Sequence, residues 1–398
     1  MSQFNVRTVV LDEPKESEAF MKQYIHCDDA GAVLMSRKGG QIAIVVENLR
    51  VPACSILKQT MLSLGGDAAV HRNVLIHAVD RSSVLLMGTL SQMKRLVKKI
   101  KPQDFGLAIL SEELNEVLEA PKPRSQRVMP YRGGMLEFGK KTLIMGILNC
   151  TPDSFSDGGK WYDTQKAIDH ALEMEQDGAD IIDIGGESTR PGSDEVSAEE
   201  EMKRVIPVIE ALAGKLSIPI SIDSYKAVTA EKALEAGAHI INDVWGFQRD
   251  PEMAKVAAKF QCPSIVMHNK TEAVYDDFMS EMMAFLRHSI ELGVEAGLPK
   301  SQMIVDPGFG FGKEMEHNLT LTAKLKELSA TGCPILMAAS RKKTLGLILD
   351  APADQRIEGD AAITAMSILN GADMVRVHDV KEMVKVAKVA DAVAAADY

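Results

Sequence analysis

The segment PISIDSYKAVTAEKALEAGAHIINDV (219–244) contains one complete structural unit of the chain. It begins with a short apolar run at 219–223, continues with a helical pattern that ends in KALEAGA (232–238), and closes with a second apolar run at 239–244. Continuous apolar runs of this length are typical of parallel strands buried on both faces, and a glycine near the end of the pattern stops the helix. The segment therefore predicts a strand, a helix and a parallel strand.

The same alternation repeats on both sides of this segment. Eight apolar runs follow residue 140, at 142–149, 179–185, 219–223, 239–244, 262–268, 303–308, 334–340 and 374–379. Eight strand–helix units in about 255 residues match the size of a (β/α)8 TIM barrel, an α/β fold. An open, doubly wound sheet usually carries a glycine-rich phosphate loop after its first strand, and ILNCTPDSFSDGG (147–159) is not one. We therefore expect the barrel over residues 131–398.

The residues before the barrel predict a small α/β domain over 1–130. Strands are expected at 41–48 and 83–88, and helices at 55–66 and 91–101. The stretch PKPRSQRVMPYRGG (121–134) is rich in proline, glycine and basic residues and is expected to be a linker or an irregular entry to the barrel. The basic run in the second helix is expected to be a solvated face rather than a phosphate site, and no chemistry is assigned to this domain.

Composition excludes several classes of function. Apolar residues make up 46% and charged residues 25%, as in ordinary globular proteins, while 5% aromatics and a net charge of −11 argue against a nucleic-acid partner. The five cysteines are scattered without a C-x-x-C pair, which argues against a disulfide framework or structural zinc and indicates a reducing, cytoplasmic location. The first residues do not resemble a signal peptide, and no apolar run is long enough to span a membrane.

Polar side chains stand at the carboxyl ends of the predicted strands. In a barrel these ends meet at one face, where active sites lie, so a shared site is favoured over a set of independent caps. The residues concerned are Asn149, Asp183, Asp223, Asn242, His268, Asp306, Ser340, Arg376 and His378.

Three of these side chains, Asp223, Asn242 and Asp306, have the hydrogen-bonding groups to hold the edge of a flat heterocycle such as a pterin. Lys342 follows the seventh strand and could approach a ring carbonyl or nitrogen. For each residue taken alone, a structural ion pair inside the barrel is an equally good interpretation.

A second group of residues indicates an anion site. Arg376 and His378 lie two apart on the last strand and so share a face, and the run SRKK (340–343) is expected to open a helix. Phosphate sites recur near the last two strands of such barrels. Asn149 and Asp157 offer oxygens for Mg²⁺, and the alternative for Asp157 is a residue that caps a loop.

Two segments rich in small and polar residues, 149–161 and 185–195, are expected to be mobile covers of the site. The segment DPGFGFGK (306–313) lacks the spacing of a nucleotide-binding loop and is expected to be a turn that aims Phe311 inward. The side chains that could line the covers are Phe155, Thr189, Arg190 and Pro191.

Taken together, the motifs NxTPDSFSDGG, GGESTRPG, SIDS, INDV, DPGFGFGK, SRK and RxHD resemble those of the dihydropteroate synthase family, in the family's order, over about two-thirds of the chain. The resemblance implies a (β/α)8 barrel and a transferase that joins 6-hydroxymethyl-7,8-dihydropterin pyrophosphate to 4-aminobenzoate, giving 7,8-dihydropteroate and pyrophosphate. It also implies small-molecule substrates, Mg²⁺ and a homodimer.

The resemblance carries site roles onto individual residues. The residues implied to bind the pterin are Asp223, Asn242, Met267, Asp306 and Lys342. Those implied to bind the pyrophosphate are Asn149, Thr189, Arg190, Arg376 and His378. Asn149 and Asp157 are implied to bind Mg²⁺. The residues implied to contact the aminobenzoate or to lie in the covering loops are Phe155, Pro191, Phe311 and Lys343. The residues expected to act in catalysis are Asp223, Asp306, Lys342, Arg376 and His378.

Three positions depart from the common family pattern. Lys343 replaces a small residue, HNKTE (268–272) replaces an HMKG-like sequence, and Trp245 follows INDV, so His268 and Trp245 receive no role. A methyltetrahydrofolate:corrinoid methyltransferase would share the barrel and the Asp and Asn strand ends but would leave STRPG, SRKK and RVHD unexplained. A non-catalytic pterin-binding protein would require a damaged site, and no expected element is missing from the sequence.

Overall fold

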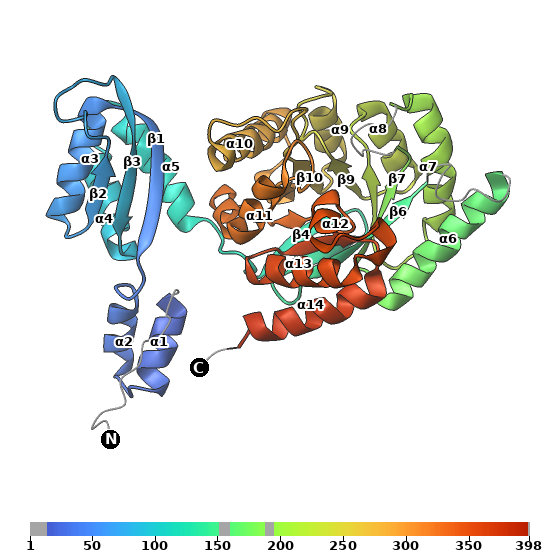
Figure 1. Ribbon diagram of the computed structural model, residues 1–398, viewed down its shortest axis with the longest axis horizontal. Coiled ribbons are helices and arrows are strands. Elements are labelled where there is room, and N and C mark those ends of the chain that lie inside the picture. Colours follow the sequence, from blue (N-terminus) through green and yellow to red (C-terminus); the bar gives the residue numbers. More distant parts are fainter. Residues whose placement is uncertain (1–13, 151–159, 188–194, 397–398) are drawn as a thin grey trace. The chain divides into compact units, whose positions relative to one another are not determined.

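The computed structural model describes residues 14–150, 160–187 and 195–396 (Figure 1). The chain divides into two compact units, Met1–Ala120 with Ala396–Tyr398, and Pro121–Ala395. The sequence predicted the boundary near residue 130, and the structure places it at Pro121. The difference arises because Arg124 is bonded to the barrel: its guanidinium donates to Asp391 Oδ1 at 2.6 Å and Thr142 Oγ1 at 2.8 Å.

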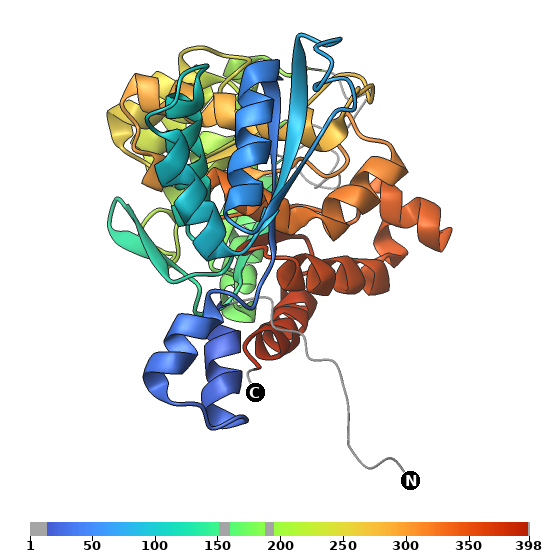
Figure 2. The same cartoon turned by 90° about the vertical axis from the view of Figure 1, so that its left-hand side faces the viewer.

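The N-terminal unit is built on an antiparallel sheet of order β1 (Ile42–Arg50), β3 (Arg81–Gly88), β2 (Asp67–Val70). Three helices supply the apolar core against this sheet, α3 (Val51–Ser63), α4 (Leu90–Ile100) and α5 (Leu107–Glu119). Two short helices, α1 (Pro14–Gln23) and α2 (Asp29–Ser36), precede the sheet and lie side by side (Figures 1 and 2). The expected strands and helices of this unit are present, while β2, α1 and α2 were not predicted.

The second unit is the expected parallel barrel. Its strands are β6 (Leu143–Asn149), β7 (Ile181–Gly185), β8 (Ile220–Asp223), β9 (Ile240–Asp243), β10 (Ser264–Met267), β11 (Met303–Asp306), β12 (Leu336–Met337) and β13 (Met374–Val377). Each strand pairs with its neighbour in chain order, and β13 returns to pair with β6. A parallel bridge between Val305 and Ile335 joins β11 to the start of β12 and closes the ring.

Helices alternate with these strands and bury their apolar faces against them. They are α6 (Lys160–Asp177), α7 (Ala198–Leu212), α8 (Ala227–Ala236), α9 (Met253–Phe260), α10 (Phe278–Ala296), α11 (Met315–Ala323), α12 (Lys343–Leu349), α13 (Ile357–Leu369) and α14 (Val380–Ala394). No helix in the described ranges is both long and apolar enough to cross a bilayer.

A hairpin closes the amino-terminal end of the barrel. Strands β4 (Arg127–Tyr131) and β5 (Gly134–Phe138) pair with each other, and their buried side chains Met129 and Phe138 pack on barrel residues such as Met145. The expectation of an irregular entry over 121–134 is therefore wrong for its second half: Pro130 and the two glycines there belong to a two-stranded ribbon and its turn. The carboxyl ends of the strands form the opposite end, called here the barrel mouth.

Candidate active site at the barrel mouth

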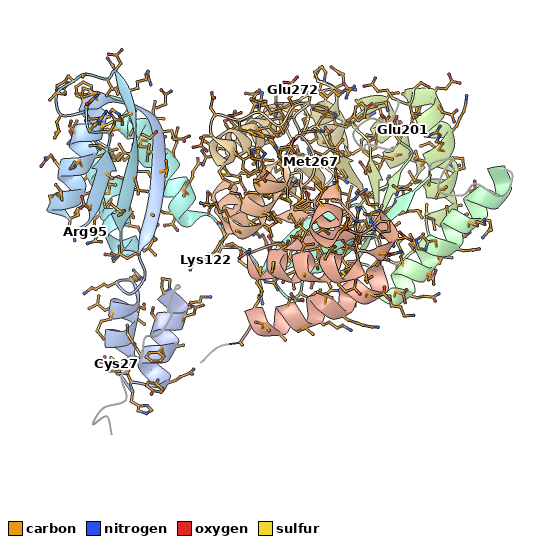
Figure 3. All side chains as sticks on the ribbon, viewed as in Figure 1. Cys27, Arg95, Lys122, Glu201, Met267 and Glu272 are labelled. Atoms are coloured by element: carbon orange, nitrogen blue, oxygen red, sulfur yellow. The ribbon has the colours of Figure 1, made fainter. Side chains whose placement is uncertain are left out.

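Four predicted residues stand on four successive strands, β8 to β11, at the barrel mouth. Asp223 ends β8 and is in register with Asn242 on β9, while Asp306 ends β11 in register with Met267 on β10. All four side chains are buried or nearly so, and Figure 3 labels Met267 within the barrel unit. The order of the strands therefore brings two carboxylates, an amide and a thioether to one end of the barrel.

Arg376 crosses the interior from β13 and bridges two carboxylates. Its Nε donates to Asp183 Oδ2 and its Nη2 donates to Asp223 Oδ2, both at 2.6 Å. Asn242 Nδ2 donates to the same Asp183 oxygen at 3.0 Å. Asp183 was noticed in the sequence as a polar strand end but received no role, and the structure makes it the residue that joins Arg376 to Asn242.

Burial changes the proton affinity of the carboxyl groups at the mouth. It raises the pKa of Asp223 to about 7, although the neighbouring Arg376 acts in the opposite direction. Burial also raises the pKa of Asp306, against the hydrogen bond of 2.7 Å that Asp306 Oδ1 accepts from the Gly308 N–H and against the charge of Lys342. These carboxylates are held in a site that disfavours their charge, which suits them to a cationic partner.

Lys342 and Phe311 contact each other beside these carboxylates. The Lys342 ammonium lies 3.9 Å from the centre of the Phe311 ring and donates to the Phe309 carbonyl at 3.0 Å. Phe311 also packs on the apolar cluster of Tyr225, Val244 and Met267 at the mouth. The turn after β11 thus directs Phe311 toward the interior, beside Lys342.

The same turn is stabilised by a hydrogen bond from Lys313, a residue to which the sequence gave no role. Its buried ammonium donates to the Phe311 carbonyl at 3.0 Å and lies 2.8 Å from His268 Nδ1. Burial lowers the pKa of Lys313 to about 7 and that of His268 to about 2, so the imidazole is neutral and its Nδ1 accepts the hydrogen bond. His268 is therefore a structural acceptor for Lys313.

His378 is oriented by a chain of hydrogen bonds at the end of β13. Ser340 Oγ lies 2.9 Å from Asp360 Oδ2 and 3.0 Å from His378 Nδ1. The serine has one proton, and the carboxylate accepts it, so His378 Nδ1 carries a proton and donates it to Ser340. Asp360, which fixes this arrangement from α13, gave no signal in the sequence. Arg341 does not face the site, since its guanidinium is paired with Asp379.

A further ionic cluster, which the sequence analysis did not identify, stands where the described part of the GGESTRPG motif ends. Lys226 contacts Glu187 and lies 3.0 Å from Glu201 Oε2, and the Tyr225 hydroxyl donates to Glu187 Oε1 at 3.0 Å. Three of these four side chains are largely buried, so the cluster fixes the end of β7 to α7 and α8. Its one sequence signal is the position of Glu187 within that motif.

The remaining predicted residues fall into two groups. Asn149 ends β6 in register with Gly185, and Lys343 is exposed at the first position of α12. Five other candidates lie outside the described residues, namely Phe155, Asp157, Thr189, Arg190 and Pro191. Among the residues that the structure covers, no group of three histidines, cysteines or acidic residues could hold a metal ion.

Comparisons with known proteins identify the family of the barrel unit. The profile of the family described as "Pterin binding enzyme" matches residues 145–378. The dihydropteroate synthase of Bacillus subtilis is 50% identical over 266 residues, 67% of this chain and 93% of that protein. A structure of the Xanthomonas albilineans dihydropteroate synthase with 4-aminobenzoic acid covers 68% of this chain and 100% of its own, with a TM-score of 0.66 and 39% identity.

One relative also matches part of the N-terminal unit. The probable bifunctional folylpolyglutamate synthase/dihydropteroate synthase of Halobacterium salinarum is 38% identical over 376 residues, 92% of this chain and 44% of that protein. A match of that length must extend well before Pro121, so part of the N-terminal unit is similar to a segment of this relative.

Proposed function

We propose how the barrel mouth works in a chain that belongs to the pterin-binding enzyme family and, within it, to the dihydropteroate synthases. The chain is a transferase that condenses 6-hydroxymethyl-7,8-dihydropterin pyrophosphate with 4-aminobenzoate to 7,8-dihydropteroate and pyrophosphate. The roles of individual residues rest on one observation above all: the buried side chains of Asp223, Asn242 and Asp306 stand at the carboxyl ends of their strands, and Arg376 is bonded to Asp223 among them.

The pterin binds in the interior of the mouth. Asp223, Asn242 and Asp306 present oxygens to the amino and ring N–H groups of the pterin, and Lys342 donates to an acceptor on the ring. Met267 lies beside the ring plane because it is in register with Asp306. The donor-rich edge of a pterin offsets the cost of keeping three acceptor side chains buried.

The reaction proceeds through a cationic transition state. The carbon that loses pyrophosphate is attached to an electron-rich pterin, so positive charge develops there, and Asp223 and Asp306 stabilise it electrostatically. The arylamine of 4-aminobenzoate is uncharged at neutral pH and attacks without a strong base. No thiol nucleophile is needed, and burial raises the pKa of the nearby Cys150 to about 12, which keeps it protonated.

The leaving pyrophosphate is bound by Arg376 and His378. Arg376 uses Nε and Nη2 to bind the two carboxylates, which leaves its Nη1 group to donate to the pyrophosphate. His378 is oriented by the hydrogen bond between its Nδ1 and Ser340. Asn149 at the end of β6, with Asp157, would hold Mg²⁺, and these few hard oxygen ligands suit an ion that also binds phosphate oxygens. When bound, this ion neutralises charge on the leaving group.

The aminobenzoate binds above the pterin. Phe311 supplies an apolar wall beside Lys342. Thr189, Arg190, Pro191 and Phe155 are assigned to the aminobenzoate, the pyrophosphate and the covering loops on the strength of the family resemblance, and Lys343 is assigned to the carboxylate of the aminobenzoate on the same ground.

Replacement of His378 by Gln tests the pyrophosphate assignment. A charge-assisted hydrogen bond contributes about 1.5–3 kcal/mol, so the Kd of dihydropterin pyrophosphate should rise about 10- to 100-fold in calorimetric titrations. Binding of free 6-hydroxymethylpterin should stay unchanged, and His288→Gln on the exposed face of α10 is the matched control. Equal losses for both ligands would reject the assignment.

We also infer that the chain forms a homodimer in the cytoplasm. Helices α12 and α13 pack together and expose apolar side chains that are each more than half accessible, Leu347, Ile348, Met366 and Leu369. A second copy of this face would cover them. Leu347→Glu should then yield monomers by light scattering, while Val294→Glu on α10 should not. A wild-type chain that is monomeric at working concentrations would contradict the dimer.

A further inference from the structure

Asp183 lies at the centre of the polar network inside the barrel, although it is not among the residues assigned to a substrate. It stands on β7 in register with Ser221, two residues below the level of Asp223, and its side chain is fully buried. Its Oδ2 accepts from both Arg376 Nε and Asn242 Nδ2, while its Oδ1 is buried without a hydrogen-bond partner among the described residues.

These contacts determine the orientation of the Asn242 amide. An oxygen that receives the Nε proton of Arg376 can only accept, whether or not the other oxygen of the same carboxyl carries a proton. The Asn242 atom at 3.0 Å from this oxygen must therefore be the nitrogen. The Asn242 carbonyl Oδ1 makes no hydrogen bond with any described residue and is left as an acceptor for a ligand.

The same carboxylate orients Arg376. The Nε edge of the guanidinium is bonded to Asp183 and its Nη2 to Asp223, so two fixed contacts determine the plane of the group. With Asp183 absent, the guanidinium could rotate about its single remaining contact to Asp223, and Nη1 would no longer have a fixed direction.

We propose that Asp183 is a positioning residue of the synthase, which fixes Asn242 as a hydrogen-bond acceptor toward the pterin and sets the plane of the Arg376 guanidinium. This role rests on the proposed assignment of Asn242 and Arg376 to the substrate. It gives a reason for a buried carboxylate that has one oxygen unpartnered within the described structure, an arrangement that packing alone would disfavour.

The variant Asp183→Leu removes the shared acceptor and keeps a side chain of similar size. The Asn242 amide then has no partner that distinguishes its nitrogen from its oxygen, and it can present N–H₂ instead of the carbonyl to the donor edge of the pterin. We expect the Kd of free 6-hydroxymethylpterin, measured by calorimetric titration, to rise about tenfold or more.

The isosteric variant Asp183→Asn separates positioning from a general loss of charge. A single oxygen of Asp183 accepts both hydrogen bonds, so the introduced amide can keep both with its carbonyl and place its N–H₂ where Oδ1 now stands without a partner. Asn242 then keeps its orientation, and we expect a Kd within about threefold of the wild type. Ser221→Ala, at the same depth on β8, is the matched control.

The outcomes are distinct. If the wild type fails to bind the pterin, the proposed roles of Asn242 and Arg376 fail with it. If the wild type binds and D183L binds equally well, or if D183N loses as much affinity as D183L, the positioning role alone is wrong, and in the second case the charge of Asp183 is what matters.

A measurement on the wild type covers the case in which D183L does not fold. In the pterin complex, the side-chain N–H₂ protons of Asn242 should show nuclear Overhauser effects to the Nε proton of Arg376, because both groups donate to the same Asp183 oxygen. Effects from these N–H₂ protons to the N–H protons of the pterin instead would reject the proposal.

Discussion

At the scale of the residue, the site keeps carboxylates where their charge is unfavourable. Burial raises the pKa of both Asp223 and Asp306, and the cations that lie near them, Arg376 and Lys342, only partly offset this effect. Such an arrangement costs stability in the absence of substrate and is useful when a positive charge develops in the bound pterin. Activity and stability should therefore respond to the same substitution in opposite directions.

Asp306→Asn tests this opposition. The amide can still accept from the Gly308 N–H but carries no charge, so kcat/KM should fall by about 100-fold or more. The folded-state pKa of Asp306 is raised, so its ionised form lowers stability at neutral pH, and the variant should unfold at the same temperature or higher. Steady-state kinetics and thermal melts check both, with Asp169→Asn on exposed α6 as control. A less stable variant with near-native activity would refute the prediction.

The sequence identified the strand-end residues but not their mutual contacts. The positions of the strand ends show which side chains stand at the mouth, so Asp223, Asn242 and Asp306 could be selected, and Lys342 could be selected because it follows the seventh strand. These positions do not determine which donor meets which acceptor across the barrel. The roles of Asp183, Lys313 and Asp360 depend on such contacts, which is why they emerged only from the structure.

At the scale of the element, the loops after β10 and β11 are joined by Lys313. This buried ammonium contacts His268 after β10 and the Phe311 carbonyl after β11, and it fixes the turn that carries Phe311 toward Lys342. Burial lowers its pKa from 10.5 to about 7 in the folded chain. Its proton therefore links the stability of this loop pair to pH.

Below about pH 7 both the folded and the unfolded chain hold this proton, and the cost of burying the charge is fully present. Above pH 7 the folded chain loses the proton while the unfolded chain keeps it. The contribution of Lys313 to the free energy of unfolding therefore increases with pH until the pH reaches the unfolded pKa. The sign follows from linkage. A group that binds more protons in the unfolded state makes the free energy of unfolding increase with pH.

Lys313→Met should remove this contribution, which amounts to about 2 kcal/mol between pH 7 and 9. Denaturant unfolding at several pH values measures it. Lys255→Met on exposed α9 should leave the pH dependence unchanged. Equal slopes in the wild type and both variants would contradict the lowered pKa.

The elements themselves were predicted well where apolar runs are long. All eight barrel strands occur within the expected runs, although β12 is reduced to Leu336–Met337. The β4–β5 hairpin was missed because Pro130 and the glycine pair at its turn are typical of loops. Here they belong to a two-stranded ribbon, in which both strands are edge strands, and an edge strand tolerates proline, which has no N–H to donate.

At the scale of the whole molecule, the barrel unit begins at Pro121 rather than near residue 130. Arg124 bonds Asp391 and Thr142, and its backbone N–H donates to Asp373 Oδ1 at 3.0 Å. These contacts anchor the first residues of the unit to β6, β13 and α14. The barrel unit should therefore fold without the N-terminal unit only if the cut leaves Arg124 in the barrel fragment.

Two truncations test the boundary. Residues 121–398 should fold and retain kcat/KM within about twofold of the full chain, because the mouth and the anchor are intact. Residues 131–398 leave Asp373 and Asp391 without Arg124 and β5 without β4. The truncation also removes Arg127, the ion-pair partner of the buried Asp373 carboxylate, and loss of one partner of such a pair costs about 3–5 kcal/mol, so the melting temperature should fall by about 10 °C or more. Equal melting temperatures for the two would contradict the structural boundary.

The most direct measurement of the central claim is product formation by the purified chain. With dihydropterin pyrophosphate, labelled 4-aminobenzoate and Mg²⁺, the wild type should give labelled dihydropteroate and stoichiometric pyrophosphate, and Asp306→Asn should give almost none. Absence of both products from a wild-type chain that still binds the pterin would contradict the assignment of the barrel mouth as the synthase site.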